Sequence, residues 1–167
     1  TAVWGDVPHE MICQVAKNFG GVPHRAELVR VLDGVSYYND SIGTSPTRTA
    51  NGTLQLYDRK IILIAGGYDK HIPYDTLGPI IMDKVKTLIL MGATADKIEA
   101  AVKAAPNYCE QEIVILHADS MEKAVALAKE QAQKGDIVSL SPASASFDLY
   151  PNFEARGNHF KNIVNEL

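Results

Sequence analysis

Residues able to bind an anion follow an apolar segment in the middle of the chain. The stretch IILIAGGYDKH (61–71) ends its apolar run in two glycines, and Lys70 comes three residues later. Glycines after a buried strand let a ligand approach the backbone closely. The P-loop pattern G-x-x-x-x-G-K-[ST] is absent, because His71 and Pro73 follow the lysine. Lys70 is therefore either a ligand for another kind of anion or a solvated charge beside two turn glycines.

A second candidate anion site lies in SPASASFDLYPNFEARG (141–157), where small residues precede a predicted helix. Serine hydroxyls and free backbone N–H groups at a helix start bind a carboxylate or a phosphate. The alternative is a turn with an N-cap, in which Phe147 and Phe153 only seal the core.

A third polar segment, NDSIGTSPT (39–47), also lies between a predicted strand and a predicted helix. Its Asp40 either binds a ribose hydroxyl or accepts hydrogen bonds within the turn. In the preceding linker, His24 and Arg25 either reach a nucleotide phosphate or lie inert at the surface. The other histidines share no metal-ligand spacing, and no nucleophile–base pair is recognisable. This pattern indicates a domain that holds substrates and contains no metal site.

The composition limits the partners and the setting of the protein. The 167 residues carry a net charge of −4 and a pI near 5.7 without a basic stripe, which disfavours nucleic acid. Cys13 and Cys109 lack C-x-x-C spacing, so we predict no disulfide framework and a reducing cytoplasm as the setting. No apolar run approaches the roughly 20 residues that cross a bilayer, and no signal-peptide pattern opens the chain. We therefore predict no membrane partner.

Apolar segments without polar alternation recur along the second half of the chain, and a helical pattern follows each one. Strands of this kind are buried on both faces, which predicts a parallel sheet covered by helices. The predicted strands are 60–65, 87–91, 112–117 and 136–141, and the predicted helices are 74–84, 94–105, 120–133 and a last one ending near Val164.

An antiparallel hairpin is predicted at the N-terminal edge of this sheet. The alternating segments 26–32 and 35–39 flank Asp33-Gly34, which is a strong short-range hairpin signal. The predicted fold class is therefore α/β: a Rossmann-like, open, mostly parallel sheet of about five strands, with helices on both faces and the hairpin before it.

Two helices are predicted outside this repeating pattern. Residues 8–19 carry apolar side chains at helical spacing and end at Gly20-Gly21, before the linker 22–25. Ser45-Pro46 predicts the N-cap and first residue of a helix to about 56. The chain begins without methionine, in what reads as the end of a helix, and we expect it to be a fragment of a longer protein.

Ligands of open α/β sheets bind at the carboxyl ends of the strands. The loops that follow the predicted strands are 40–45, 66–73, 92–94, 117–120 and 142–153. We expect loops 66–73 and 142–153 to lie on one edge of the sheet and to share a ligand.

Four motifs in order closely resemble the C-terminal domain of the Mur ligase family. They are GVPHR (21–25), YYNDSIGTSP (37–46), LIAGGYDK (63–70) and SLSPASASFDLYPNFEARG (139–157). Within that family the ligases that add D-glutamate are the most similar, and the D-N-P-R motif of those that add meso-diaminopimelate is absent. The alternatives are another Mur ligase, a folylpolyglutamate synthase-like ligase, or a free-standing α/β module that binds a small ligand.

The resemblance implies a three-domain, ATP-dependent ligase of peptidoglycan biosynthesis. Residues 1–22 would be the tail of its central ATPase domain with a linker, and 23–167 its amino-acid-binding domain. The missing domains would hold the UDP-sugar, Mg²⁺ and most of ATP. The carboxylate of UDP-N-acetylmuramoyl-L-alanine would become an acyl phosphate, which the amine of D-glutamate attacks. Without a P-loop, this fragment would not turn over alone.

The resemblance also implies roles for the residues of the candidate sites. Lys70 and Thr44 would bind one carboxylate of D-glutamate. Ser146 and the backbone N–H of Phe153 would bind the other, and Phe147 would line the pocket.

A nucleotide would contact other residues of the chain. By resemblance, Asp40 would contact the ATP ribose and Arg25 the phosphates, with His24 beside them. Many relatives carry D-S-K-[AS]-T where this chain has Asp40 to Thr44. Ile42 replaces that lysine, so any cationic role at this position is absent here.

Overall fold

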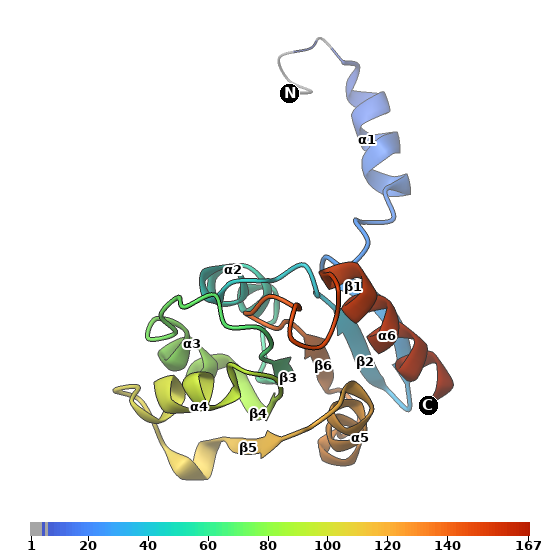
Figure 1. Ribbon diagram of the computed structural model, residues 1–167. Helices are drawn as coiled ribbons and strands as arrows, with labels where there is room; N and C mark the ends of the chain where they lie inside the picture. The colour runs from blue at the N-terminus through green and yellow to red at the C-terminus, as the bar shows by residue number, and fades with distance from the viewer. Residues whose placement is uncertain (1–4, 6) are drawn as a thin grey trace.

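A six-stranded, mostly parallel sheet forms the centre of the protein (Figure 1). The computed structural model describes Gly5 and residues 7–167. The strand order is β1-β2-β6-β3-β4-β5, in which β1 is antiparallel to β2 and all other neighbours are parallel. The strands are β1 (Glu27–Leu32), β2 (Val35–Asn39), β3 (Ile61–Ala65), β4 (Val85–Leu90), β5 (Val114–His117) and β6 (Ile137–Leu140). The predicted α/β class with an N-terminal hairpin is confirmed.

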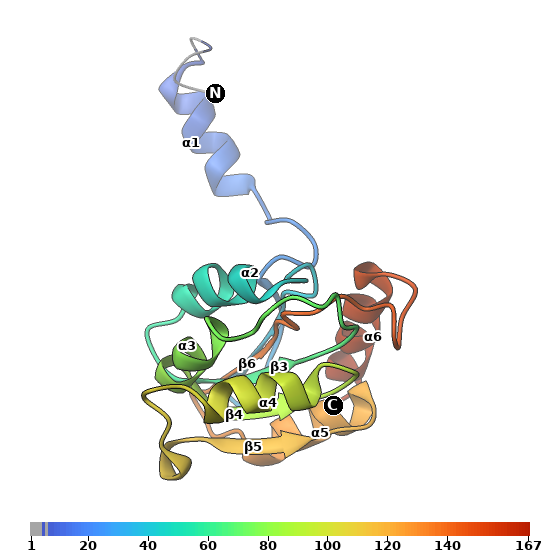
Figure 2. The same ribbon diagram turned by 60° about the vertical axis from the view of Figure 1, so that its left-hand side comes forward.

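Helices cover both faces of the sheet, as Figure 2 shows from a second direction. One face carries α2 (Pro46–Asn51), α3 (Leu77–Lys84) and α4 (Ala95–Lys103), and the other carries α5 (Met121–Gln131) and α6 (Phe153–Glu166). Short 3-10 helices, η1 (Thr53–Leu56) and η2 (Glu110–Glu112), complete the connections. The predicted helix 46–56 is thus two pieces, because the chain turns at Gly52, whose N–H donates to Arg48 O.

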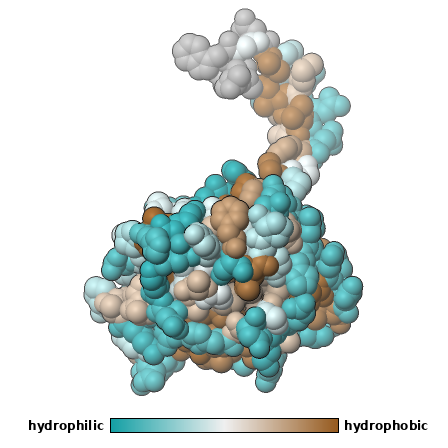
Figure 3. Space-filling model, viewed as in Figure 1, coloured by the Kyte–Doolittle hydropathy of each residue, from teal (hydrophilic) through white to brown (hydrophobic). Residues whose placement is uncertain are grey.

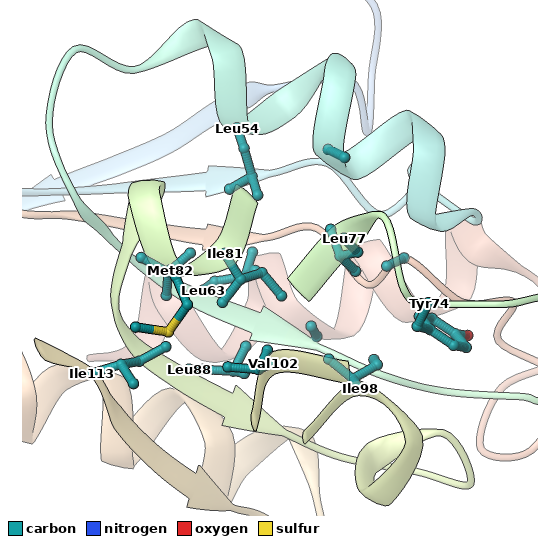
Figure 4. Close-up of a cluster of buried hydrophobic side chains, with 14 of the residues drawn as sticks. Leu54, Leu63, Tyr74, Leu77, Ile81, Met82, Leu88, Ile98, Val102 and Ile113 are labelled. Atoms are coloured by element: carbon teal, nitrogen blue, oxygen red, sulfur yellow. The ribbon is translucent and has the colours of Figure 1, made fainter. Parts of the chain in front are cut away.

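The core consists of two apolar layers, one on each face of the sheet. Along the fully buried β3, the side chains of Ile61 and Leu63 enter the layer under α2, α3 and α4. Those of Ile62 and Ile64 enter the layer under α5 and α6. This alternation follows from the two-residue period of a strand. Figure 4 shows the first layer, in which side chains of α3 and α4 meet those of β3 and β4.

The hairpin forms for the reason that its sequence predicts. Asp33 and Gly34 have φ angles of 52° and 81°, which are the left-handed values of a two-residue hairpin turn. Glycine adopts such a conformation without steric cost, and aspartate tolerates it better than most residues. The turn pairs Leu32 with Val35 and leaves β2 free to join β6 in the parallel sheet.

Side-chain caps set the starts of three helices. Ser45 accepts a hydrogen bond from Arg48 N at 3.4 Å, and Ser120 accepts one from Lys123 N at 3.2 Å. The cap at Ser45 was predicted from serine's preference for this position. The cap of α6, Asn152, was not predicted.

Helix α1 (His9–Asn18) stands away from the rest of the protein (Figure 1). Its apolar side chains lie along one side and are exposed, as the brown residues at the top of Figure 3 show. Phe19, just after the helix, is 65% exposed. Within the described residues, none of the helices is both long enough and apolar enough to cross a membrane.

Candidate functional site

The loops that follow β3 and β6 meet at the carboxyl edge of the sheet. Tyr68 N donates to Ala145 O at 2.9 Å, and Gly66 N donates to Pro142 O at 2.8 Å. These bonds form a short bridge between residues almost eighty positions apart in the chain. The expectation that loops 66–73 and 142–153 lie on one edge is therefore confirmed.

The glycines of the first loop are required by this close approach. A Cβ atom on Gly66 would lie 2.0 Å from Met91 O, and one on Gly67 would lie 2.2 Å from Ala145 O. Both residues also have left-handed φ values, 110° and 147°. Packing between loops therefore accounts for both glycines, without a ligand at their backbone.

A pocket of about 240 Å³ opens where these loops meet the start of α6. Its lining contains all five residues that the sequence assigned to amino-acid binding. The lining residues are Thr44, Lys70, Ala145, Ser146, Phe147, Asn152, Phe153 and Glu154. Three loops that are distant in sequence thus contribute to one concave site, which we call the small pocket.

Lys70 brings a positive charge to the small pocket, and no salt bridge of this residue is found among the described residues. Its neighbour Asp69 is already paired with Lys97 and with His71. The hydrogen bond from Lys97 and that from the His71 backbone lower the pKa of Asp69. Lys70 itself is exposed, so its ammonium group is available to an anion.

The first turn of α6 adds hydrogen-bond donors to the small pocket. Asn152 Oδ1 accepts from Ala155 N at 2.7 Å, which satisfies one of the free N–H groups of this turn. Among the described residues, no protein acceptor is found for the N–H groups of Phe153 and Glu154. These groups and the helix dipole favour an anion here. Glu154 is the only acidic residue of the lining and opposes that preference.

The two phenylalanines of this region differ in position. Phe147 is 66% exposed and packs edge-on against Tyr68, with ring centroids 6.0 Å apart. It therefore forms a rim of the small pocket and does not seal the core. Phe153 is half-buried, and its ring lies 5.9 Å from that of His24.

Arg156 lies behind the small pocket and was not predicted from the sequence. Its side chain is 2% exposed and donates to Ser41 and to the carbonyl oxygens of Ser144 and Ala145. Desolvation lowers the pKa of this guanidinium to about 10, so it stays charged at neutral pH. In the sequence, Arg156 was part of the family motif 139–157 and lay one turn into a predicted helix, but neither fact indicated that it is buried.

A second, larger pocket of about 610 Å³ lies beside α2 and the linker. Two of the three residues predicted to contact ATP, Arg25 and Asp40, line it. The full lining is Arg25, Ala26, Asp40, Ser45, Thr47, Arg48, Asn51, Gly52, Thr53 and Leu56. Arg48 was not predicted, and it gives this pocket a second guanidinium. Its Nε atom is buried without a partner among the described residues.

Asp40 is buried and already hydrogen-bonded within the protein. Its side chain accepts from Ala26 N at 3.1 Å, from Ser141 Oγ at 3.0 Å and from Thr53 Oγ1. The residue is 1% exposed. The donors to the Asp40 side chain come from distant segments and not from the turn itself, and the ribose contact stays a prediction.

His24 lies outside the lining of both pockets. It is 7% exposed, has a left-handed φ of 62°, and its Nδ1 lies 2.9 Å from Asn39 Nδ2. Its carbonyl oxygen accepts from Ile42 N at 3.2 Å. The histidine therefore anchors the linker between the two pockets, and it is not inert.

The fold also gathers Asp96, Glu99 and His117, whose ligand atoms lie within 4.8 Å of one another. No spacing in the sequence predicts this cluster. Glu99 already pairs with His117 at 2.7 Å and with Lys103 at 2.6 Å, and these hydrogen bonds lower its pKa. The cluster is therefore explained as a set of surface ion pairs.

The fold and the two pockets define an α/β domain that presents cationic and hydrogen-bond-donating groups at the carboxyl edge of its sheet. The chain belongs to the Mur ligase family: residues 24–144 match the domain described as "Mur ligase, glutamate ligase domain".

Curated relatives match almost the whole chain. A UDP-N-acetylmuramoylalanine–D-glutamate ligase of Clostridium acetobutylicum is 57% identical over 99% of this chain. A ligase of the same name from Clostridium botulinum (strain Okra / Type B1) is 57% identical over 92% of it. The chain spans only 36% and 33% of those two proteins, so it corresponds to about a third of their length.

Solved structures share the fold at low sequence identity. The murein peptide ligase Mpl from Psychrobacter arcticus has a TM-score of 0.55 at 16% identity, covering 93% of this chain and 32% of its own. A domain from a putative UDP-N-acetylmuramate:L-alanyl-gamma-D-glutamyl-medo-diaminopimelate ligase of Haemophilus ducreyi has a TM-score of 0.50 at 15% identity. That match covers 86% of this chain and 96% of the other.

Proposed function

We propose that this chain is the amino-acid-binding domain of a cytoplasmic ligase that adds D-glutamate to UDP-N-acetylmuramoyl-L-alanine at the expense of ATP. The observation that carries the proposal is the small pocket, which gathers Lys70, Ser146 and the start of α6 from separate loops. The Clostridium relatives, which bear the name of this ligase, support the choice of substrate.

D-Glutamate fits the small pocket as a dicarboxylate. Lys70 and Thr44 bind one carboxylate from the loops after β3 and β2, since an ammonium group pairs with it as a compact point charge. Ser146 and the N–H of Phe153 bind the other carboxylate at the start of α6. The two ends of the substrate are thereby held by different loops, which orients its amine.

ATP is assigned to the larger pocket only in part. Arg25 and Arg48 offer two guanidinium groups for its phosphates, and the volume of about 610 Å³ is of the size that ligand sites have. Asp40, the one acidic side chain among the described residues that line this pocket, is buried and already accepts three hydrogen bonds from the protein, so it is poorly placed to bind Mg²⁺. The rest of the complete protein is therefore expected to hold the metal ion, the UDP-sugar and the remaining part of ATP.

Residues 1–22 are proposed to connect this domain to the rest of the ligase. They include α1, whose exposed apolar side suits burial against another part of a larger protein. Closing the domains over the substrates would align the amine with the acyl phosphate and exclude water.

The test is ADP release by the complete protein in the presence of ATP and UDP-N-acetylmuramoyl-L-alanine. Release that depends on D-glutamate supports the proposal, whereas dependence on meso-diaminopimelate or on a folate would support one of the alternative ligases. The 167-residue chain alone should release no ADP and should bind D-glutamate weakly by calorimetry. Tight binding by the chain alone would favour a free-standing binding module.

A further inference from the structure

Arg156 uses its whole hydrogen-bonding capacity on two loops. Its Nε donates to Ser41 Oγ at 3.0 Å, and its two terminal nitrogens donate to Ser41 O, Ser144 O and Ala145 O at 2.9 to 3.2 Å. These five bonds match the five N–H donors of a guanidinium. Lysine has three donors without a fixed plane, so it cannot reproduce this pattern.

The bonds of Arg156 connect every part of the small pocket. Ser41 precedes Thr44 in the loop after β2, and Ala145 precedes Ser146 in the loop after β6. Ala145 O also accepts from Tyr68 N, which lies in the loop that carries Lys70.

The same network reaches the start of α6. Ser41 Oγ donates to Phe153 O at 2.8 Å, at the helix start that offers free N–H groups to the small pocket. Gly67 lies so close that a Cβ atom there would be 3.1 Å from Arg156 Nη1. The loop after β3 therefore also packs directly on the guanidinium.

The charge of Arg156 is buried without a direct acidic partner. All its hydrogen-bond acceptors are neutral oxygens. Asp148, whose charge acts to raise the pKa of Arg156, makes no hydrogen bond to it among the described residues. Burying a cation costs several kcal/mol unless other groups compensate. Backbone carbonyl dipoles and the Asp148 carboxylate offset part of that cost, and the cation itself lies behind the small pocket.

We propose that Arg156 is a positioning residue for the dicarboxylate substrate, which locks the three loops into one preformed site and favours a negative ligand there. This inference rests on the proposed function. It adds a residue that does not touch the ligand but sets the distance between the two carboxylate-binding ends.

The first test is steady-state kinetics of the complete ligase with Arg156→Lys and Arg156→Met. Arg156→Lys keeps the charge and loses the planar fork, and we expect a KM for D-glutamate raised about tenfold. Arg156→Met loses both and should raise it further. The KM values for ATP and for the UDP-sugar should change less than about twofold, which corresponds to under about 0.5 kcal/mol.

Arg30, which lies in β1, offers a matched control because it binds the other end of α6. Its Nη1 donates to Val164 O and Asn165 O, at 3.1 and 3.0 Å, far along α6 from the small pocket. Arg30→Lys should leave the KM for D-glutamate unchanged. Equal increases in all three KM values for Arg156→Lys, or an unchanged KM for D-glutamate, would overturn the proposal.

The second test does not depend on substrate. Amide hydrogen exchange of the 167-residue chain reports the bonds from Tyr68 N and Gly66 N, and Arg156→Lys should accelerate their exchange while Arg30→Lys should not. Unchanged exchange would overturn the positioning role.

If Arg156→Met fails to fold, the results for Arg156→Lys alone decide whether the proposal holds. A wild-type ligase that ignores D-glutamate would refute the proposed function alone, and hydrogen exchange would still decide the role of Arg156.

Discussion

Tyr68 donates its backbone N–H to the carbonyl oxygen of Ala145 at 2.9 Å, and this bond joins the loops after β3 and β6. Lys70 comes two residues after the donor, and Ser146 comes one residue after the acceptor. This contact, together with the bond from Gly66 N to Pro142 O, brings together the two groups that we propose for the carboxylates of D-glutamate. The first two predictions concern these groups.

Lys70→Ala in the complete ligase should raise the KM for D-glutamate about ten- to a hundredfold. A charge-assisted hydrogen bond in a partly dry site is worth about 1.5–3 kcal/mol. Steady-state kinetics with varied D-glutamate measure it. Lys60→Ala is the control, because Lys60 pairs with Glu112 outside both pockets. A selective loss of ATP affinity in the Lys70 variant would assign this lysine to the nucleotide instead.

Ser146→Ala should raise the same KM, but by less, since a neutral donor contributes about 0.5–1.5 kcal/mol. Ser146 is 2% exposed, so the substitution removes only the hydroxyl at the pocket wall. The Lys70→Ala/Ser146→Ala double variant should be less than additive, because both residues hold one ligand. Strict additivity in a double-mutant cycle would argue for two separate ligands.

Arg48→Ala should raise the KM for ATP by about tenfold and leave that for D-glutamate unchanged. The reason is its place in the larger pocket with Arg25, where a guanidinium hydrogen bond to a phosphate is worth about 1.5 kcal/mol. Arg59→Ala is the matched control, since Arg59 pairs with Asp58 at an exposed site. An Arg48 variant with normal ATP dependence would remove this residue from the nucleotide site.

Asp40→Ala should lower the free energy of unfolding of the 167-residue chain by about 1–3 kcal/mol. The substitution leaves Ala26 N and the hydroxyls of Ser141 and Thr53 without their buried acceptor. Urea denaturation followed by circular dichroism measures the change. Unaltered stability together with a raised KM for ATP would instead support the ribose contact that the family resemblance implies.

Stability should decline as the pH falls through the acid range, and Glu27 should contribute to this decline. Partial burial acts to raise the pKa of Glu27, but the hydrogen bonds from Lys161, His24 N and Asn39 outweigh it and leave the pKa below 4.5. The folded-state pKa is thus lower than the unfolded one, so the stabilisation is present above about pH 4.5 and is lost as the folded form protonates. Glu27→Gln should show a shallower loss of stability below that pH in urea titrations. Parallel curves for the two proteins would contradict this.

Much of the fold could be predicted because its determinants are local. Asp33-Gly34 defines a hairpin through the φ values that these two residues tolerate, and Ser45 and Ser120 cap helices with their own hydroxyls. Ile61 to Ala65 lack polar alternation, which predicts a strand buried on both faces. Order along the chain then places every loop after a parallel strand at one edge of the sheet.

The burial and the hydrogen-bond partners of individual side chains at that edge could not be predicted, because they depend on contacts between distant segments. Nothing in the local sequence around Asp40 shows whether the protein itself hydrogen-bonds this carboxylate, and only the approach of Thr53 and Ser141 shows that it does. Arg156 lies on a helix where most arginines face water, and it is buried here because the loops after β2 and β6 close over it. Hydrogen bonds across such sequence separations leave no periodic pattern in the chain. The sequence therefore determined which elements form and which loops share one edge of the sheet, whereas the tertiary structure decided which polar groups at that edge are already used by the protein itself.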